Sequence, residues 1–328
     1  MKYKNLGKTD MKISVLGLGC MGMTHAYGSP SDEKEMIKLI HSAVDMGITL
    51  FDTAECYTGI NPEGKTVYNE ELVGKALKPY RNKILIATKC GVRHREDHSL
   101  IMDSRPETIR KSVEGSLKRL GIDYIDIYYQ HRVDPNVPPE EVAGVMQELI
   151  GEGKIRAWGI SEAREDYIKR ADSVCKVSAV QNRYSMMYRE YEDLLPFLGN
   201  AEITLVAHCP LANGFLTGKY GKNTEFDKKN DYRSQMPQFK AESIDKNKEL
   251  LYMLNYISEE KNASPAQVSL AWLIAKGIVP IPGTRKLSRL EENAGAADVI
   301  LTDEEVLNID NALKTMEMSE VFGGHKAK

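Results

Sequence analysis

Eight short apolar segments alternate with helical patterns along the chain, and this alternation constrains the fold more than any other feature. The segments are rich in β-branched residues and carry few charges, as expected of strands covered by helices on both faces. Strands are predicted over Val15–Gly19, Ile48–Asp52, Ile84–Lys89, Tyr124–Gln130, Ile155–Ile160, Ser178–Asn182, Ile203–Cys209 and Ile278–Pro282. Repeated strand–helix units favour parallel strands with right-handed crossovers. We therefore predict one α/β domain over residues 1–328, folded as a single closed (β/α)8 TIM barrel, with a doubly wound open sheet as the alternative.

Local signals mark the ends of several of the intervening helices. The apolar residues Ile109, Val113, Leu117 and Leu120 share one helical face, and Gly121 supplies a C-terminal stop. Residues 264–267 and 302–305 each place a Ser or Thr three positions before a Gln or Glu. This spacing predicts a capping box at the start of each helix.

Two segments lie outside the repeat. Tyr3–Leu6 and Lys12–Val15 predict an N-terminal β-hairpin at the bottom of the barrel. Asn213–Phe239, after the seventh strand, is long and polar, and loops of this length within compact domains are usually functional.

Composition excludes several classes of protein. The net charge is −3 and there is no dense Lys/Arg tract, which argues against a nucleic-acid or membrane-surface protein. No apolar stretch approaches the roughly 18 residues that span a bilayer, and the first ten residues lack the apolar run of a signal peptide. The five cysteines contain no Cys-x-x-Cys pair, which indicates reduced thiols in a cytoplasmic protein. No metal is expected, because His94, Asp97 and His98 lie in a polar stretch typical of a surface loop.

Four titratable residues fall at, or just after, the ends of three successive predicted strands. Asp52 ends the second strand, Lys89 ends the third and His131 follows the fourth; Tyr57 lies five residues after Asp52. Barrel active sites lie where strands end, and neighbouring strands are about 4.8 Å apart, so these side chains can converge. Lys89 would lower the pKa of Tyr57, and Asp52 would keep Lys89 charged. Each residue alone is equally consistent with loop capping or packing; together they predict a proton-donating site in which His131 orients a carbonyl.

The turn after the eighth strand has the composition of a phosphate site. Gly283 and Thr284 lead into a predicted helix, and a glycine turn before a helix N-terminus is a natural phosphate cradle. Barrels often bind phosphate after strands seven and eight. Positive charge suited to a 2′-phosphate comes from Arg285, Lys286 and Arg289. The alternative interpretation is a solvated helix start.

These motifs together resemble the aldo-keto reductase family, from near Met1 to near Ala312. The resemblance rests on Leu16–Met23, Phe51–Ala54, Gly153–Ser161, Gly214–Lys219 and Arg289–Asn293. It implies a (β/α)8 barrel that binds NADPH, with NADH less suited, and reduces aldehydes or ketones to alcohols reversibly by hydride transfer. It further implies a catalytic tetrad of Asp52, Tyr57, Lys89 and His131, with Tyr57 as the proton donor.

The resemblance also implies a set of cofactor contacts. Ser161 and Gln181 would hold the nicotinamide carboxamide, and Arg285 and Arg289 would meet the 2′-phosphate. The full implied set is Cys20, Met21, Ser161, Glu162, Gln181, His208, Cys209, Pro210, Leu211, Asn213, Gly214, Lys219, Gly283, Thr284, Arg285, Arg289, Glu292 and Asn293. Within it, Cys209, Leu211 and Asn213 would lie along the pyrophosphate, and Glu292 and Asn293 near the adenine. The polar segment after Gly214 would cover the cofactor.

The sequence departs from the family pattern at four of these positions. A carboxylate at Glu162, where relatives have Asn or Glu, would alter carboxamide binding. His208-Cys209 replaces a frequent Tyr-Ser, so His208 would stack less well on nicotinamide or respond to pH. Asn213 stands where many relatives have Arg, which weakens the expected charge contact with the pyrophosphate.

Four cysteines, Cys20, Cys56, Cys90 and Cys209, fall on the predicted active-site face. Lys89 could lower the pKa of a nearby thiol, Cys56 or Cys90, and make it prone to oxidation. The alternative interpretation is that small residues fill tight sites.

Two other functions compete with carbonyl reduction. An NADPH-binding regulatory subunit with little turnover, as in the potassium-channel β subunits, would keep the barrel but act through a partner protein. A barrel aldolase would use Lys89 as a Schiff-base nucleophile, which a charged pair with Asp52 disfavours. The expected partner is a small-molecule carbonyl substrate whose identity depends on the region after Gly214 and the tail Glu317–Lys328. The sequence leaves the oligomeric state open.

Overall fold

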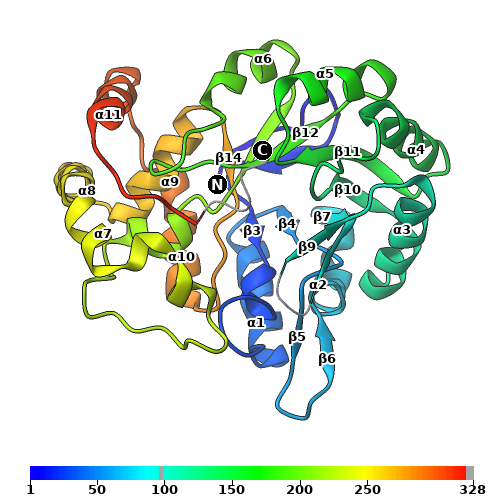
Figure 1. Cartoon of the computed structure of the whole chain (residues 1–328), viewed down its shortest axis with the longest axis horizontal. Coiled ribbons are helices and arrows are strands. Elements are labelled where there is room, and N and C mark those ends of the chain that lie inside the picture. Colours follow the sequence, from blue (N-terminus) through cyan, green and yellow to red (C-terminus); the bar gives the residue numbers. More distant parts are fainter. Residues whose placement is uncertain (96–98, 323–328) are drawn as a thin grey trace.

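Eight parallel strands form the centre of the molecule (Figure 1). The computed structural model describes residues 1–95 and 99–322. The strands follow the spatial order β14-β13-β12-β11-β10-β7-β4-β3. Their bounds are β3 Leu18–Gly19, β4 Leu50–Asp52, β7 Leu85–Cys90, β10 Ile125–Gln130, β11 Ile155–Ser161, β12 Ala179–Arg183, β13 Thr204–His208 and β14 Val279–Pro280. All eight predicted strands are therefore present, each within a few residues of its expected bounds.

Contacts between the two outermost strands curl this sheet round on itself. The Gly17 amide donates to the Pro280 carbonyl at 2.9 Å, and Gly19 and Gly283 form a parallel bridge. Pro280 and Pro282 have no N–H to donate, which explains why β14 and β3 are short. The fold is TIM-barrel-like, as predicted, and the open-sheet alternative is wrong.

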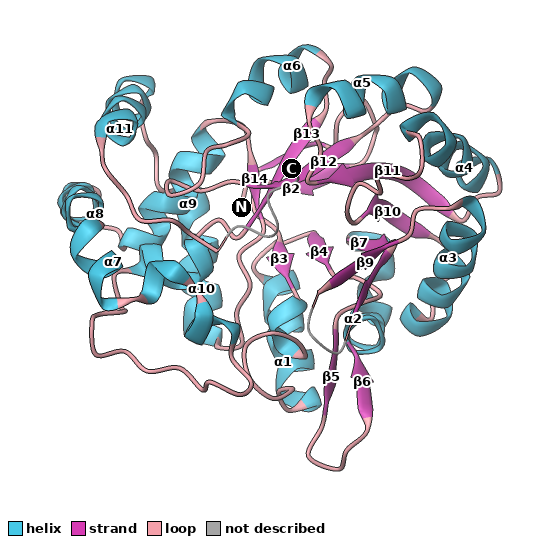
Figure 2. Cartoon of the chain, viewed as in Figure 1, coloured by secondary structure: helices cyan, strands magenta, loops and turns pink. Residues whose placement is uncertain are grey.

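Helices surround the strands on the outside (Figure 2). They are α1 Glu33–Asp45, α2 Asn69–Leu77, α3 Pro106–Leu120, α4 Pro139–Gly151, α5 Glu165–Val174, α6 Leu195–Asn200, α7 Ala241–Lys246, α8 Lys248–Glu260, α9 Pro265–Ala275, α10 Leu287–Gly295 and α11 Asp303–Thr315. Helix α3 ends at Gly121, whose φ of 65° is left-handed, and capping boxes begin α9 at Ser264 and α11 at Thr302, as predicted. Among the described residues, none of these helices has the length and apolarity to cross a bilayer.

The N-terminal hairpin closes the bottom of the barrel. Strands β1 (Tyr3–Asn5) and β2 (Lys12–Ser14) pair antiparallel. Leu6, Met11 and Ile13 are buried in one cluster with the inward-facing side chains of the barrel strands. The hairpin therefore contributes to the core inside the barrel. The site lies at the opposite ends of the same strands.

Several loop elements were not expected from the sequence. Two antiparallel hairpins, β5 (Thr58–Ile60) with β6 (Thr66–Tyr68) and β8 (Val92–His94) with β9 (Leu100–Met102), follow β4 and β7. Their largely exposed strands lack the alternation of apolar residues that reveals a strand in sequence. Residues 213–239 contain short 3-10 helices, including Tyr232–Gln235 and Pro237–Phe239. Asp97 and His98 of the discounted metal spacing, and the last six residues of the C-terminal tail, lie outside the described residues.

Candidate active site

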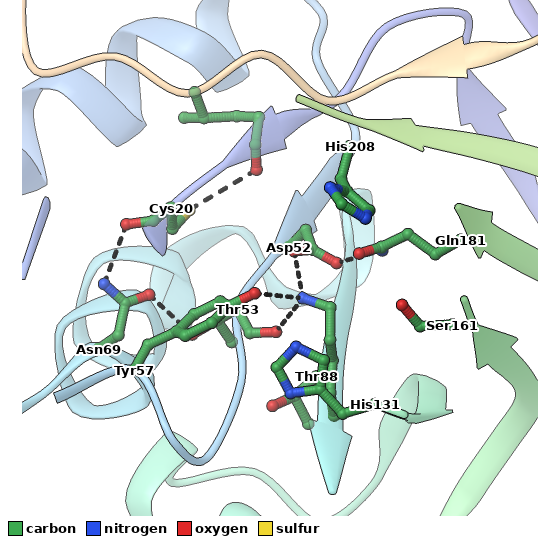
Figure 3. A network of polar contacts seen from close by, with 12 residues as sticks. Cys20, Asp52, Thr53, Tyr57, Asn69, Thr88, His131, Ser161, Gln181 and His208 are labelled. Atoms are coloured by element: carbon green, nitrogen blue, oxygen red, sulfur yellow. Dashed lines mark hydrogen bonds and ion pairs between the residues drawn. The ribbon is translucent and has the colours of Figure 1, made fainter. Parts of the chain in front are cut away.

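The barrel brings the four predicted catalytic side chains to one edge. Asp52 is the last residue of β4, Lys89 lies near the end of β7, and His131 follows β10 directly. Tyr57 lies in the loop between β4 and β5 and stacks edge-on against His131, with ring centroids 5.7 Å apart. In Figure 3 the side chains of Asp52, Tyr57 and His131 point into the same space.

Lys89 is the centre of a buried polar network. Its Nζ donates to Asp52 Oδ1 at 2.5 Å, to the Thr53 carbonyl at 2.8 Å and to Tyr57 Oη at 3.2 Å. Gln181 Nε2 donates to the other oxygen of Asp52 at 2.8 Å. Because Asp52 and Lys89 are both almost completely buried, each charge depends on the other for compensation. The bond from Gln181 to Asp52 was not predicted; Gln181 was singled out only as a cofactor contact.

Asn69 at the start of α2 supports this network and was also missed. It is fully buried, accepts a hydrogen bond from Thr53 Oγ1 at 2.7 Å, and donates to the Cys20 carbonyl at 2.9 Å. Asn69 thus ties the end of β3 to the end of β4 (Figure 3). A buried amide at a helix start has no distinctive sequence signature, which is why sequence reasoning did not find it.

Tyr57 is protonated at neutral pH. Burial, followed by the negative charge of Asp52, raises the pKa of Tyr57 well above its usual value. The net shift is therefore opposite to the expected lowering by Lys89, because burial and the charge of Asp52 outweigh the attraction of the lysine for the phenolate. Asp52, only 2.5 Å away, also neutralises the charge of Lys89.

His131 is neutral at the same pH. Burial lowers its pKa well below the usual value, and the charges of Arg132 and Lys89 act in the same direction. His131 Nδ1 lies 3.5 Å from Cys56 Sγ. Burial raises the pKa of Cys56 to about 12, so the thiol keeps the proton that it can donate to Nδ1.

Glu162 and His208, two of the departures noted in the sequence, contact each other. His208 Nε2 lies 2.6 Å from Glu162 Oε1, and the second oxygen of Glu162 accepts from Tyr191 Oη at 3.0 Å. Although burial alone would raise it, the hydrogen bond and charge of His208 lower the pKa of Glu162. Burial would lower the pKa of His208, but Cys209 and Glu162 outweigh it and raise that pKa. The two side chains therefore form an ion pair at slightly acidic to neutral pH.

The other predicted cofactor contacts line a continuous edge. Cys20 and Met21 follow β3, Gly283 and Thr284 follow β14, and Pro210, Leu211 and Gly214 follow β13. These three strands are neighbours in the barrel. Ser161, at the end of β11, accepts a hydrogen bond from Arg132 at 3.1 Å. The structure thus brings these predicted residues to the same face as the tetrad.

The family was established by comparison with known proteins. The aldo/keto reductase family model matches residues 15–314. The "Probable aldo-keto reductase 1" of Glycine max is 41% identical over 323 residues, covering 97% of this chain and 90% of the relative. The chain belongs to the aldo/keto reductase family. It is an NAD(P)H-dependent oxidoreductase of the carbonyl-reducing type.

Two further relatives agree. An aldo-keto reductase of Strobilurus tenacellus is 37% identical over 329 residues, covering 96% of this chain and 93% of the relative. The structure of a glycerol dehydrogenase from Gluconobacter oxydans superimposes with a TM-score of 0.84 at 29% identity, covering 99% of both chains.

Residues 213–239 of this aldo/keto reductase cross the edge that carries the site. Asn213 Nδ2 donates to Tyr27 Oη at 2.7 Å, and Tyr27 forms a bridge with Asp231. The Gly28 amide donates to the Asn230 carbonyl at 2.8 Å. These contacts join the segment to the loop that follows β3.

Positive charge gathers at the start of α10 in the reductase. Arg285 donates to the Ser29 carbonyl at 3.1 Å and to the Tyr27 carbonyl, while Arg289 is exposed on the first turn of α10. Lys219 forms an ion pair with Glu292 of α10 at 3.0 Å. Asn293, the residue after Glu292, is buried. Arginine guanidinium groups at a helix start suit a phosphate, so this end of the edge fits the phosphorylated half of a dinucleotide.

The thiols on this face differ from the sequence-based expectation. Burial raises the pKa of Cys20, Cys56 and Cys90 in the reductase. The hypothesis that Lys89 activates Cys56 or Cys90 is therefore wrong, because desolvation of a buried thiolate outweighs the attraction of a lysine already paired with Asp52. Cys209, half-buried after β13, is the exception: its pKa is lowered to about 7.

Proposed function

We propose that this chain catalyses NADPH-dependent reduction of aldehydes or ketones to alcohols, with Tyr57 as the proton donor. The observation that carries the proposal is the buried hydrogen-bond network in which Lys89 contacts both Asp52 and Tyr57. A nicotinamide cofactor, when bound, supplies the hydride that goes to the carbonyl carbon. The side chains of this site must then bind and polarise the carbonyl and deliver one proton to its oxygen.

Tyr57 suits the role of the donor in the reducing direction. Its raised pKa keeps the proton on Oη until negative charge develops on the substrate oxygen. Lys89 Nζ, 3.2 Å from Oη, then stabilises the phenolate that remains. Asp52 fixes the position of Lys89 through a buried ion pair.

His131 suits the role of a neutral hydrogen-bond donor to the carbonyl oxygen. The Cys56 thiol, whose pKa is raised to about 12, donates to Nδ1 and so leaves the proton of the neutral ring on Nε2. An Nε2–H beside Tyr57 can orient the carbonyl without competing for its proton. Cys56 thus acts as a positioning residue for His131.

The preference for NADPH over NADH rests on Arg285 and Arg289. A guanidinium group matches the geometry of a phosphate, and both residues lie beside the start of α10. Ser161 and Gln181, closer to the tetrad, offer hydroxyl and amide groups for the nicotinamide carboxamide. Residues 213–239 would cover the bound cofactor, and Lys219 and Glu292 would hold them to α10.

The test is loss of nicotinamide absorbance with NADPH and with NADH over a panel of aldehydes and ketones. Wild type is expected to oxidise NADPH faster than NADH with at least one carbonyl. Tyr57→Phe removes the proton but keeps the ring, so it is expected to bind NADPH as wild type does and lose at least about a hundredfold in turnover.

The absorbance assay and a separate borohydride-trapping experiment distinguish the competing functions. Tight NADPH binding with no turnover of any carbonyl by wild type would replace the proposal with a regulatory subunit. A borohydride-trapped covalent adduct on Lys89 would replace it with an aldolase. The buried ion pair with Asp52 argues against the aldolase, because a protonated lysine is not a nucleophile.

A further inference from the structure

Cys209, His208 and Glu162 form a nucleophile–base–carboxylate cluster at the end of β13. Cys209 Sγ is 3.4 Å from His208 Nδ1, and the other ring nitrogen of His208 is 2.6 Å from Glu162 Oε1. Glu162 is itself held by the Arg183 amide at 2.8 Å and by Tyr191 Oη. A thiol, an imidazole and an orienting carboxylate in this order form the constellation that activates cysteine nucleophiles.

The charges around the thiol favour its ionised form. Arg183 of β12 lies opposite His208 of β13 in the strand register, and Cys209 is the residue after His208. Burial alone would raise the pKa of Cys209, but Arg183 and then His208 outweigh burial and lower it to about 7. Asn213 Nδ2, 3.8 Å from Sγ, adds a hydrogen-bond donor to the thiolate.

Cys209 and His208 are also partly exposed, unlike the other cysteines of the same face. Cys20, Cys56 and Cys90 are buried, and Cys175 lies on the far side of the barrel before β12 with a raised pKa. Cys209 directly follows β13, so it lies on the same edge of the parallel strands as the tetrad. A small electrophile that reaches this face can therefore meet a partly exposed thiolate.

We propose that Cys209 is a covalent modification site for soft electrophiles of the α,β-unsaturated carbonyl class. The thiolate adds to the β-carbon of the alkene, and a carbon–sulfur bond forms as the carbon–carbon π bond breaks. The electron pair moves to the α-carbon and carbonyl oxygen, and protonated His208 supplies the proton that completes the saturated adduct. No oxidant and no hydride are consumed, so this chemistry is independent of the proposed reduction.

The experiment treats nucleotide-free protein with a limiting amount of methyl vinyl ketone at neutral pH. Intact-protein mass and peptide mapping then give the site and rate of addition. The expected result is one fast adduct on Cys209 in wild type and in the control Cys175→Ser, and no fast adduct in Cys209→Ser. Equal labelling of Cys209→Ser and wild type, or first labelling at another cysteine, would overturn the proposal whether or not the protein reduces carbonyls.

His208→Asn tests the part played by the cluster. At pH 7 a thiol with a pKa near 7 is about half ionised, whereas an ordinary thiol is ionised to a few per cent or less. The acidic thiolate is intrinsically less nucleophilic, which offsets part of the gain in reaction rate. We expect His208→Asn to label about fivefold more slowly at pH 7. We also expect the midpoint of its rate–pH curve to move up, with an unchanged circular dichroism spectrum. An unchanged midpoint in the folded variant would refute activation by His208.

Discussion

Lys89→Met is the substitution whose effect on stability the structure defines best. Methionine fills nearly the same volume but removes the charge and all three hydrogen bonds of Nζ. The carboxylate of Asp52 then remains buried, and among the described residues Gln181 Nε2 is its remaining side-chain partner. An uncompensated buried charge is among the most destabilising single changes in a folded protein.

The expected loss in the free energy of unfolding is about 3–5 kcal/mol, the usual cost of breaking a buried ion pair from one side. With an unfolding entropy of about 2.1 cal/mol/K per residue, a chain of 328 residues should then melt about 4–7 °C lower than wild type. Lys154→Met is the matched control. Lys154 also makes two ion pairs, with Glu114 and Glu152, each at 2.7 Å, but its side chain is 32% exposed and its loss should cost less than about 1 kcal/mol.

Differential scanning calorimetry of wild type and the two single variants measures these shifts. The double variant Asp52→Asn/Lys89→Met removes the unpaired charge and should be more stable than Lys89→Met alone. The reasoning is refuted if Lys89→Met melts no lower than Lys154→Met, or if adding Asp52→Asn lowers the melting temperature further.

Three other predictions concern separate parts of the molecule. Gly74→Ala would place a Cβ 2.0 Å from the Leu120 carbonyl oxygen, so its free energy of unfolding in urea should fall by about 1–3 kcal/mol or more. The control Gly144→Ala, with open space around it, should raise the free energy of unfolding by up to about 1 kcal/mol. Equal effects would contradict the packing of α2 on α3. Glu162→Gln should destabilise the protein more at pH 6 than at pH 9. The ion pair with His208 is fully formed above the unfolded pKa of Glu (about 4.3) and below that of His (about 6.5), and it is lost as pH rises through the raised pKa of His208. A pH-independent loss of stability in thermal melts would contradict this. Arg289→Ala should weaken NADPH binding about tenfold or more in fluorescence titrations and leave NADH binding nearly unchanged; equal losses would remove Arg289 from the 2′-phosphate.

The barrel was predictable from sequence because its strands are covered on both faces. Such strands read as short apolar runs, and segments such as Ile203–Cys209 were recognisable without knowledge of their neighbours. The proximity of Asp52 and Lys89 was predictable for a related reason: parallel strands end at one edge, so these two side chains had to lie close together once the strand order was assumed. The hairpins after β4 and β7 were not predictable, because exposed loop strands carry no burial pattern.

Charge effects at the site could not be derived from sequence order alone. The sequence places Lys89 near Tyr57, but only the 2.5 Å contact with Asp52 shows that the lysine charge is already balanced. Likewise, Glu162 and His208 are 46 residues apart and were treated as separate departures from the family pattern. Their pairing, and its effect on the adjacent Cys209, depends on the register of β11 with β12 and of β12 with β13.

Transfer of deuterium from NADPH to the product tests most directly whether this chain reduces carbonyls by hydride transfer. NADPH carrying deuterium at both positions of nicotinamide C4 is incubated with an aldehyde and wild-type protein, and the alcohol is analysed by NMR. We expect one deuterium on the carbinol carbon of the alcohol, and alcohol formed at least about a hundredfold more slowly by Tyr57→Phe. Alcohol without deuterium, or alcohol formed equally by Tyr57→Phe, would contradict hydride transfer to a carbonyl protonated by Tyr57.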